Sequence, residues 1–432
     1  MSDPSTTVNT DPAHFIKVVT DLGEEIPLVT SQSIFNDRGI KIIDKGAAIN
    51  AALYERLTMH TLATPIEQAV GSLHTVTGKT LREHAELAMR EIPFFERIGS
   101  DIKTRGLLLD ALENLPLPGP IAFQLMLILK TQPKLFRHSI YTALFAAWMT
   151  LDTLVSRFDL GIAAAAGLLH DIGMLHINPT LLAPHEVIDR DLRRQLYSHP
   201  LVSSVLIDGH HEYPKNMVRA IKEHHELLDG SGYPRYLSGQ AISPLGRILS
   251  IGELVSTLLG SGQEASEIHL RVLLRMNNNR YDALLVERVE RHLSLKPQGA
   301  IKQDSMAMLE DPVSRLLEIN TVIADWPEDF ILGQDLSPAR REGMLAVAAQ
   351  TTQLRRTLSS VGVASVQLAQ LGNDALDASL QLELSLLAQE AVWQLRTLSR
   401  QTKRRWHLEP ESTYPDALQA WMDRIDALTA HM

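Results

Sequence analysis

The chain has 432 residues, a formal net charge of −10, 45% hydrophobic residues and 21% charged residues. This length indicates two or three domains, and the composition is typical of a soluble globular protein. The acidic balance argues against general binding of nucleic acids. The sequence contains no cysteine, which excludes disulfides and thiolate metal sites, so any bound metal must have nitrogen and oxygen ligands.

We expect a cytoplasmic protein that does not enter a membrane. Residues 161–169 form an apolar run that is far too short to cross a bilayer. Residues 1–12 are polar and rich in Ser and Thr, and they lack the basic and then apolar order of a secretory signal.

The first section, residues 1–115, is expected to be a small module of mixed α and β structure. Residues 34–43 have apolar ends around Asn36-Asp37-Arg38-Gly39, which predicts a β-hairpin. Residues 51–59 and 81–89 have the apolar spacing of helices.

A proline-rich segment, residues 115–120, breaks any helix and separates this module from a middle section over residues 121–300. The middle section is expected to be almost wholly helical. Helix-like apolar spacing occurs in four of its stretches, residues 135–151, 159–169, 190–206 and 216–225. Most of the histidines that bear on function lie here.

The last section, residues 301–432, is expected to be a helical extension. Ser337-Pro338 is typical of a helix start, with Ser as N-cap and Pro in the first turn. One apolar stripe follows, made of Leu376, Leu380, Leu384, Leu387, Ala391, Leu395 and Leu398. We expect it to pack on the middle section or on a second copy of the chain, as in a homodimer. The basic run at residues 400–405 is interpreted as a complement to the helix C-terminus.

His170-Asp171 is the strongest local feature, at the end of an alanine-rich apolar helix and before Ile172-Gly173. Neighbouring residues of a helix point about 100° apart, since a turn holds 3.6 residues. Such a pair suits two adjacent metal ions better than chelation of one. The carboxylate can bridge them while the imidazole binds one.

A second feature is His224-His225-Glu226, followed by Asp229-Gly-Ser-Gly-Tyr233-Pro234. Adjacent histidines at a helix end, before a turn rich in glycine, indicate a fixed loop beside a metal site. His138, His199 and Glu253 lie in further stretches with helical patterns. Each of these histidines taken alone is more typical of a core or surface residue than of a ligand. The pair His210-His211 is interpreted as part of a surface loop.

The order and spacing of the whole set resemble the HD-GYP family of the HD phosphohydrolase superfamily over residues 121–300. The resemblance implies an all-helical HD-domain bundle that holds two or three divalent transition-metal ions, commonly Fe or Mn, with Zn, Ni or Co also open. Its implied ligands are His138, His170, Asp171, His199, His224, His225 and Glu253. The implied activity is hydrolysis of cyclic di-GMP to pGpG, to GMP or to both, in bacterial second-messenger signalling.

The resemblance also implies that residues 1–115 are an N-terminal regulatory module, and it implies residue roles. Asp171 and His170 would be catalytic, because the metals that they hold activate a hydroxide for in-line attack on phosphorus. Tyr233 and Gly232 would line the dinucleotide pocket. Asp229 would act as a nearby hydrogen-bond acceptor that orients the loop or a ligand histidine. His176 would stand in for a phosphate-contacting group.

Several positions depart from the family pattern. Lys134 replaces a glutamate that many members carry, which favours two metals over three. Met174 and Leu227 replace basic residues, Glu253 replaces a more usual Asp, and residues 260–265 lack a basic stretch. Three interpretations stay open: a phosphodiesterase for cyclic di-GMP, an enzyme for another phosphoester, or a signalling module that binds nucleotide or a protein partner with weak or no turnover. A fourth interpretation, of a different class, is a helical scaffold whose histidines bind no metal.

Overall fold

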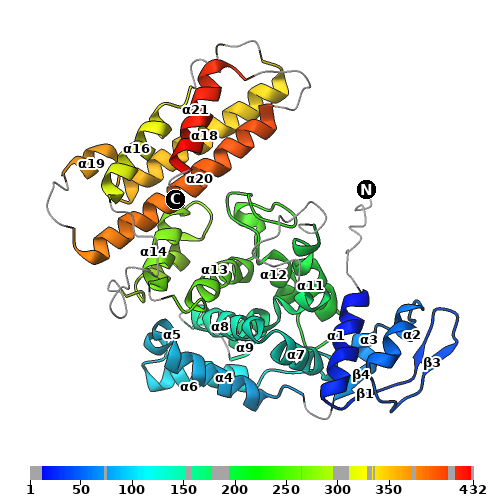
Figure 1. Cartoon of the computed structure of the whole chain (residues 1–432). Coiled ribbons are helices and arrows are strands. Elements are labelled where there is room, and N and C mark those ends of the chain that lie inside the picture. The colour runs from blue at the N-terminus through cyan, green and yellow to red at the C-terminus, as the bar shows by residue number, and fades with distance from the viewer. Residues whose placement is uncertain are drawn as a thin grey trace. The chain divides into compact units, whose positions relative to one another are not determined.

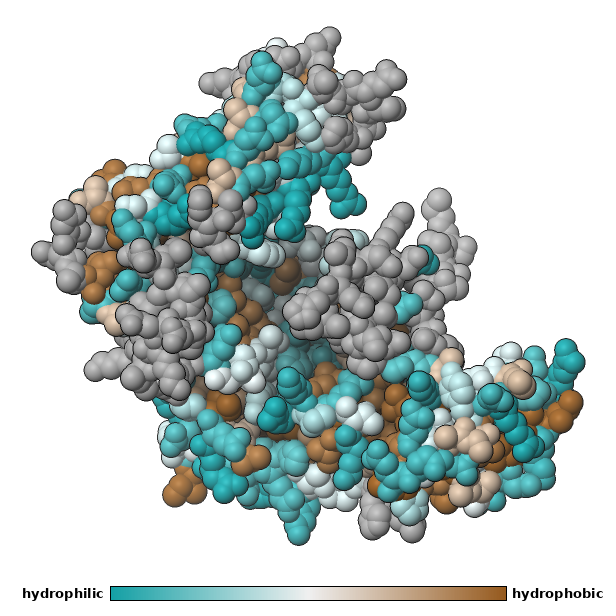
Figure 2. Space-filling model, viewed as in Figure 1, coloured by the Kyte–Doolittle hydropathy of each residue, from teal (hydrophilic) through white to brown (hydrophobic). Residues whose placement is uncertain are grey.

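The computed structural model of the chain describes residues 12–72, 75–151, 157–177, 194–263, 265–294, 311–327, 333, 336–370, 376–406 and 414–429. These residues are mainly helical, as expected, and include two small two-stranded sheets (Figure 1). None of the described helices combines the length and the apolar character that crossing a membrane requires. On the face seen in Figure 2, hydrophilic and hydrophobic side chains are interspersed.

The chain divides into two compact units. One contains Met1–Ser261 and Asn279–His292, and the other contains Gly262–Asn278 and Leu293–Met432. The segment Gly262–Asn278, which the sequence analysis included in the middle section, thus belongs with the C-terminal helices. The domain boundaries expected near residues 115 and 300 stay predictions.

The N-terminal part of the first unit contains the predicted hairpin. Strand β2 (Ile34–Phe35) pairs antiparallel with β3 (Lys41–Ile43). The Asn36 side chain closes the turn, because its Oδ1 accepts from the backbone N–H of Arg38 at 3.0 Å and of Ile40 at 2.8 Å. A second pair joins β1 (Leu28–Thr30) and β4 (Val70–Ser72). The helical elements of this part are α1 (Pro12–Glu25), η1 (Ala51–Leu53), α2 (Tyr54–Thr58) and α3 (Ile66–Ala69).

The rest of the first unit is a helical bundle around α8 (Pro133–Thr150), whose side chains are buried from Ser139 to Met149. A helix that is apolar all round must lie inside a bundle. Helices α9 (Arg157–Leu169) and α13 (Pro244–Leu259) pack on it. The remaining elements are α4 (Gly78–Glu91), α5 (Pro93–Ile98), α6 (Ile102–Glu113), α7 (Gly119–Thr131), η2 (Ile172–His176), α11 (His199–Asp208), α12 (Lys215–Glu223), η4 (Gly239–Ala241) and α15 (Ala283–Glu290).

The second unit is a bundle of α14 (Ser266–Met276), α16 (Pro312–Ala324), α18 (Pro338–Ser360), α19 (Ser365–Gln370), α20 (Ala378–Trp406) and α21 (Asp416–Thr429). The predicted start of α18 is confirmed, because the Ser337 side chain accepts from the backbone N–H of Arg340. The apolar stripe lies mostly on α20 and is covered by α14, α16, α18 and α21. Packing inside its own unit therefore buries the stripe, and the second copy that the sequence analysis considered is not needed to cover it.

Candidate metal centre

Five elements of the first unit bring the seven predicted ligands together. His138 lies in the second turn of α8, and His170-Asp171 directly follows α9. His199 opens α11, His224-His225 follows the end of α12, and Glu253 lies in the middle of α13. These side chains form two groups whose candidate ligand atoms lie within 4.8 Å of one another, and Asp171 belongs to both.

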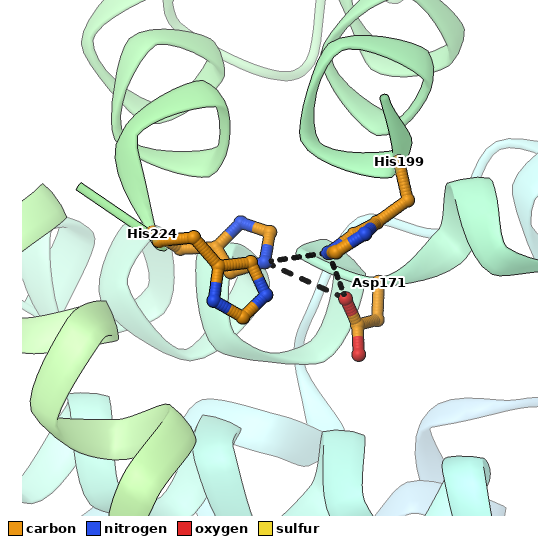
Figure 3. A group of neighbouring side chains, drawn as sticks. Asp171, His199 and His224 are labelled. Atoms are coloured by element: carbon orange, nitrogen blue, oxygen red, sulfur yellow. Dashed lines mark hydrogen bonds and ion pairs between the residues drawn. The ribbon is translucent and has the colours of Figure 1, made fainter. Parts of the chain in front are cut away.

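The first group contains Asp171, His199, His224 and His225. Asp171 Oδ1 lies 3.2 Å from His199 Nε2 and 3.5 Å from His224 Nε2. The two Nε2 atoms lie 3.1 Å from each other. Figure 3 shows these three side chains pointing toward one another from separate elements.

The second group contains His138, His170, Asp171 and Glu253. Glu253 Oε2 lies 2.8 Å from His138 Nε2 and 3.2 Å from His170 Nε2. The other oxygen of the shared carboxylate, Asp171 Oδ2, lies 3.4 Å from His170 Nε2. One oxygen of Asp171 thus faces each group.

The backbone sets which ring nitrogen carries the proton in three of these histidines. Each Nδ1 lies against a carbonyl oxygen, which can only accept, so the proton is on Nδ1. The pairs are His170 with Gly167 at 2.8 Å, His199 with Leu196 at 2.6 Å and His224 with Ile221 at 2.6 Å. In the neutral ring, Nε2 then carries a lone pair that points into the ligand group.

This arrangement fits divalent metal ions. Lone pairs of His199 and His224 that face each other at 3.1 Å repel unless a cation lies between them. The buried Oδ1 of Asp171 also receives no hydrogen bond from the part of the chain that the structure describes. Imidazole nitrogens and carboxylate oxygens, without sulfur, suit ions such as Fe, Mn, Zn, Ni and Co. The residues can therefore hold metal, while the kind and number of ions belong to the proposal below.

The electrostatics of the centre also favour bound cations. Burial opposes a charge on His170, but the Asp171 and Glu253 carboxylates outweigh it and raise the pKa of His170 to about 10. Burial likewise opposes the ionised form of Asp171, but His170 and His199 hold its pKa well below the usual range. Burial, and then His224, lowers the pKa of His225, which keeps this ring neutral as a ligand must be.

The loop after His225 is held rigidly against the centre. A Cβ on Gly232 would lie 2.4 Å from the carbonyl oxygen of His225, so only glycine fits at this close approach. The buried Glu226 accepts from the backbone N–H of Arg235 at 2.7 Å and of Leu237 at 2.8 Å. This carboxylate therefore holds the loop and is not one of the metal-binding residues.

Tyr233 is presented at the edge of the first group. Its ring stacks on His225, with 4.5 Å between centroids, and on Tyr197, with 4.1 Å. Tyr197 is 39% exposed and was missed by the sequence analysis, because it lies in no recognisable pattern. The exposed face of Tyr197 and the polar rim of Tyr233 make an aromatic wall beside the metal ligands.

Two other predicted residues lie away from the ligand groups. Asp229 accepts from the N–H and the hydroxyl of Ser231 and pairs with Arg280 at 3.3 Å, so it orients the loop. The buried His176 is in neither ligand group. Its ring stacks on Phe15 at 4.6 Å and lines a cavity of about 710 Å³ between α1, α2 and α11. The predicted contact of His176 with substrate thus has no support in its position.

The departures from the family pattern have definite places. Lys134 is exposed in the first turn of α8, one turn before His138. Met174 and Leu227 are half-buried apolar side chains beside the centre in sequence, and they provide no charge there. His210 and His211 lie outside both ligand groups, as expected, in the loop between α11 and α12.

Comparisons with known proteins agree with this geometry. A family profile described as "HD domain" matches residues 124–285. The chain is 30% identical over 122 residues to "3'3'-cGAMP-specific phosphodiesterase 3" of Vibrio cholerae, and 30% identical over 141 residues to "Cyclic di-GMP phosphodiesterase" of the same organism. It is 29% identical over 108 residues to "Cyclic di-GMP phosphodiesterase response regulator RpfG" of Xanthomonas campestris. These alignments cover 28%, 31% and 25% of this chain, and 25%, 28% and 29% of the relatives.

Among solved structures, Bd1817 of Bdellovibrio bacteriovorus, titled an HDG"Y"P protein, is 12% identical and has a TM-score of 0.34. That match covers 64% of this chain and 96% of the other. The profile match and the relatives define the class: residues 124–285 are an HD domain. The relatives, which are named as phosphodiesterases for cyclic di-GMP or 3'3'-cGAMP, are in line with the resemblance to the HD-GYP family.

Proposed function

We propose that the chain is a metal-dependent phosphodiesterase that hydrolyses a cyclic dinucleotide, with cyclic di-GMP as the first candidate and pGpG, GMP or both as products. The observation that carries this proposal is the pair of four-residue ligand groups that share Asp171. Relatives whose names specify cyclic di-GMP or 3'3'-cGAMP support the substrate class. The chain spans less than a third of the length of these relatives.

In this proposal each group holds one divalent ion, with Fe or Mn as the first candidates. His138, His170 and Glu253 serve one ion, and His199, His224 and His225 serve the other. Asp171, which belongs to both groups, would contribute to holding both ions. When bound, such a pair of ions lowers the pKa of a water molecule and offsets charge on phosphoryl oxygens.

The side chains of the protein retain the cations, orient the ligand atoms and provide a surface for the nucleobase. Asp171 and Glu253 keep the centre anionic, so that it retains cations against the cost of burial. The carbonyl contacts at Nδ1 of His170, His199 and His224 keep each Nε2 aimed at the centre, which avoids reorganisation during the reaction. Tyr197 and Tyr233 form a flat wall against which a nucleobase can stack.

The test combines metal analysis with turnover of cyclic di-GMP. Purified protein should carry close to two transition-metal ions per chain and release linear product. Asp171→Asn keeps the shape of the side chain but removes the shared charge, so we expect loss of at least one ion and of turnover. Asp208→Asn is a matched control, because Asp208 pairs with Lys215 on the surface at 2.6 Å. Metal-free wild-type protein would contradict the proposal.

A signalling module without turnover is the second candidate. The uncharged Met174 and Leu227 favour it, because they remove two groups that would contact phosphate. This candidate predicts that wild-type protein binds cyclic di-GMP without cleaving it. Turnover that is present in the wild type and lost in Asp171→Asn would exclude this candidate.

A further inference from the structure

A second cavity, of about 310 Å³, borders the metal centre at His138. It lies between the N-terminal half of α8 and the C-terminal end of α13, which meet in the first unit. The lining includes Lys134, Arg137, His138, Tyr141, Thr257 and Ser261. His138 is thus shared by the cavity and by the second ligand group.

Two cations dominate this lining. Lys134 lies four residues before His138 on α8, so both project from one face of the helix. Lys134 and Arg137 are exposed, and neither forms an ion pair with a carboxylate of the described residues. Two other arginines of the unit do have carboxylate partners, Arg82 with Glu113 at 2.7 Å and Arg247 with Asp282 at 3.1 Å. Two cations without a carboxylate partner among the described residues, beside a centre that itself holds cations, make this place favourable for an anion.

Two hydroxyl groups of the lining already have partners within the protein and are less available to bind phosphate. The Ser261 hydroxyl donates to the carbonyl oxygen of Leu258 at 2.6 Å, and Thr257 lies 3.5 Å from Glu253. Charge recognition by Lys134 and Arg137 therefore sets the chemistry of the cavity. A lysine provides a point charge and an arginine provides a planar fork, and both suit phosphate.

We propose that this cavity binds the second phosphodiester of the substrate, the one that is not being cleaved, through Lys134 and Arg137. The inference rests on the proposed function. A cyclic dinucleotide carries two phosphodiesters, so when one reaches the ligand groups, the other must lie close by. The cavity adjoins His138 and offers positive charge at that place. Lys134, which removes a carboxylate from the family's metal-binding pattern, thereby contributes to substrate recognition.

The experiment compares two substrates that differ in this second phosphate. Cyclic di-GMP has it, and bis(p-nitrophenyl) phosphate does not. Lys134→Gln and Arg137→Gln should each lower kcat/KM for cyclic di-GMP about tenfold, mainly through a higher KM, since charge-assisted contacts of this kind are worth a factor of about ten or more. Activity on bis(p-nitrophenyl) phosphate and the metal content should stay within about twofold of the wild type.

Two further variants separate this role from a structural one. Lys134→Arg retains the charge and should restore most of the affinity for cyclic di-GMP. Lys130→Gln removes an exposed charge from the last turn of α7, outside the cavity, and should leave KM unchanged. Higher ionic strength should weaken the binding of cyclic di-GMP more in the wild type than in the double variant Lys134→Gln/Arg137→Gln, because fewer charges remain to be screened in the variant.

The outcomes distinguish this inference from the proposed function. If the wild type cleaves cyclic di-GMP and the double variant has an unchanged KM, the subsite is overturned and the phosphodiesterase stands. Equal losses on both substrates would also overturn the subsite, because they indicate a role at the centre itself. Suppose that the protein cleaves bis(p-nitrophenyl) phosphate but neither cleaves nor binds cyclic di-GMP. This result would overturn the proposed subsite and the proposed substrate, while metal-dependent phosphodiester hydrolysis would stand. If the wild type binds cyclic di-GMP without turnover, the Kd for cyclic di-GMP replaces KM in this test. An unchanged Kd in the variants would then overturn the subsite.

Discussion

Two glycines of α9 offer a controlled perturbation of the metal centre. A Cβ on Gly167 would lie 2.5 Å from the carbonyl oxygen of Thr142 and 2.7 Å from the Cα of Ala143, both on α8. A Cβ on Gly161, in the same helix, would meet no heavy atom within 4 Å. Gly167→Ala therefore forces two central helices apart, while Gly161→Ala adds a methyl group in open space.

The expected energies have opposite signs. Replacing glycine by alanine inside a helix stabilises it by about 0.5–1 kcal/mol, which is the full expectation for Gly161→Ala. Carbon contacts are comfortable at about 3.5 Å, so Gly167→Ala requires a separation of roughly 1 Å between α8 and α9. Overpacking of this kind costs about 1–3 kcal/mol or more. Because both variants gain the helix propensity of alanine, their free energies of unfolding should differ by the overpacking cost alone, about 1–3 kcal/mol or more.

The separation of α8 and α9 in Gly167→Ala should also change the geometry of the metal centre. His138 on α8 and His170 after α9 have their Nε2 atoms 3.2 Å apart. Parting the helices widens this pair, so Gly167→Ala should lose metal from the second ligand group. Urea unfolding gives the stabilities, and elemental analysis gives the metal content. If Gly167→Ala is as stable and as metal-rich as Gly161→Ala, the close packing of the two helices is refuted.

Two further predictions concern buried polar groups. Glu226→Gln offers one acceptor oxygen where two backbone N–H groups need one each, so we expect a loss of about 1–3 kcal/mol and faster hydrogen exchange at Arg235 or Leu237; unchanged exchange would refute the role of Glu226. Burial, with the charge of His14 second, lowers the pKa of His176 to about 4 from its ordinary 6.5. The unfolded chain then binds the proton more readily, so this contribution to stability is complete above pH 6.5 and is lost as the pH falls toward 4, by up to about 3 kcal/mol. Urea unfolding at pH 7 and pH 5 should show a smaller drop for His176→Phe than for the wild type, and equal drops would contradict the assignment.

The seven predicted ligands came from the resemblance to the HD-GYP family, and four of them lie in short motifs that preserve local geometry. His170-Asp171 and His224-His225 each lie at a helix end, where neighbouring side chains diverge and can serve different ions. Gly232 had to be glycine, since the backbone of His225 leaves no room for a Cβ.

The sequence was less informative about residues whose role depends on neighbours far along the chain. His176, five residues after Asp171, looked well placed for substrate, but η2 turns its ring onto Phe15 of α1. Tyr197 gave no signal, because its position matters only through the stack with Tyr233. Lys134 looked like a loss to the metal site until its place in a cavity beside His138 was known.

The sequence by itself therefore determined the helical class, the hairpin, the helix start at Ser337 and the chemistry of the ligands. These follow from periodicity, turn residues and donor atoms, which are local properties. Only the tertiary structure decided that the stripe of α20 is buried within its own unit, and that Lys134 and Arg137 share one cavity. Such facts depend on how α8 packs against α9 and α13, and packing between distant segments leaves no pattern in either segment alone.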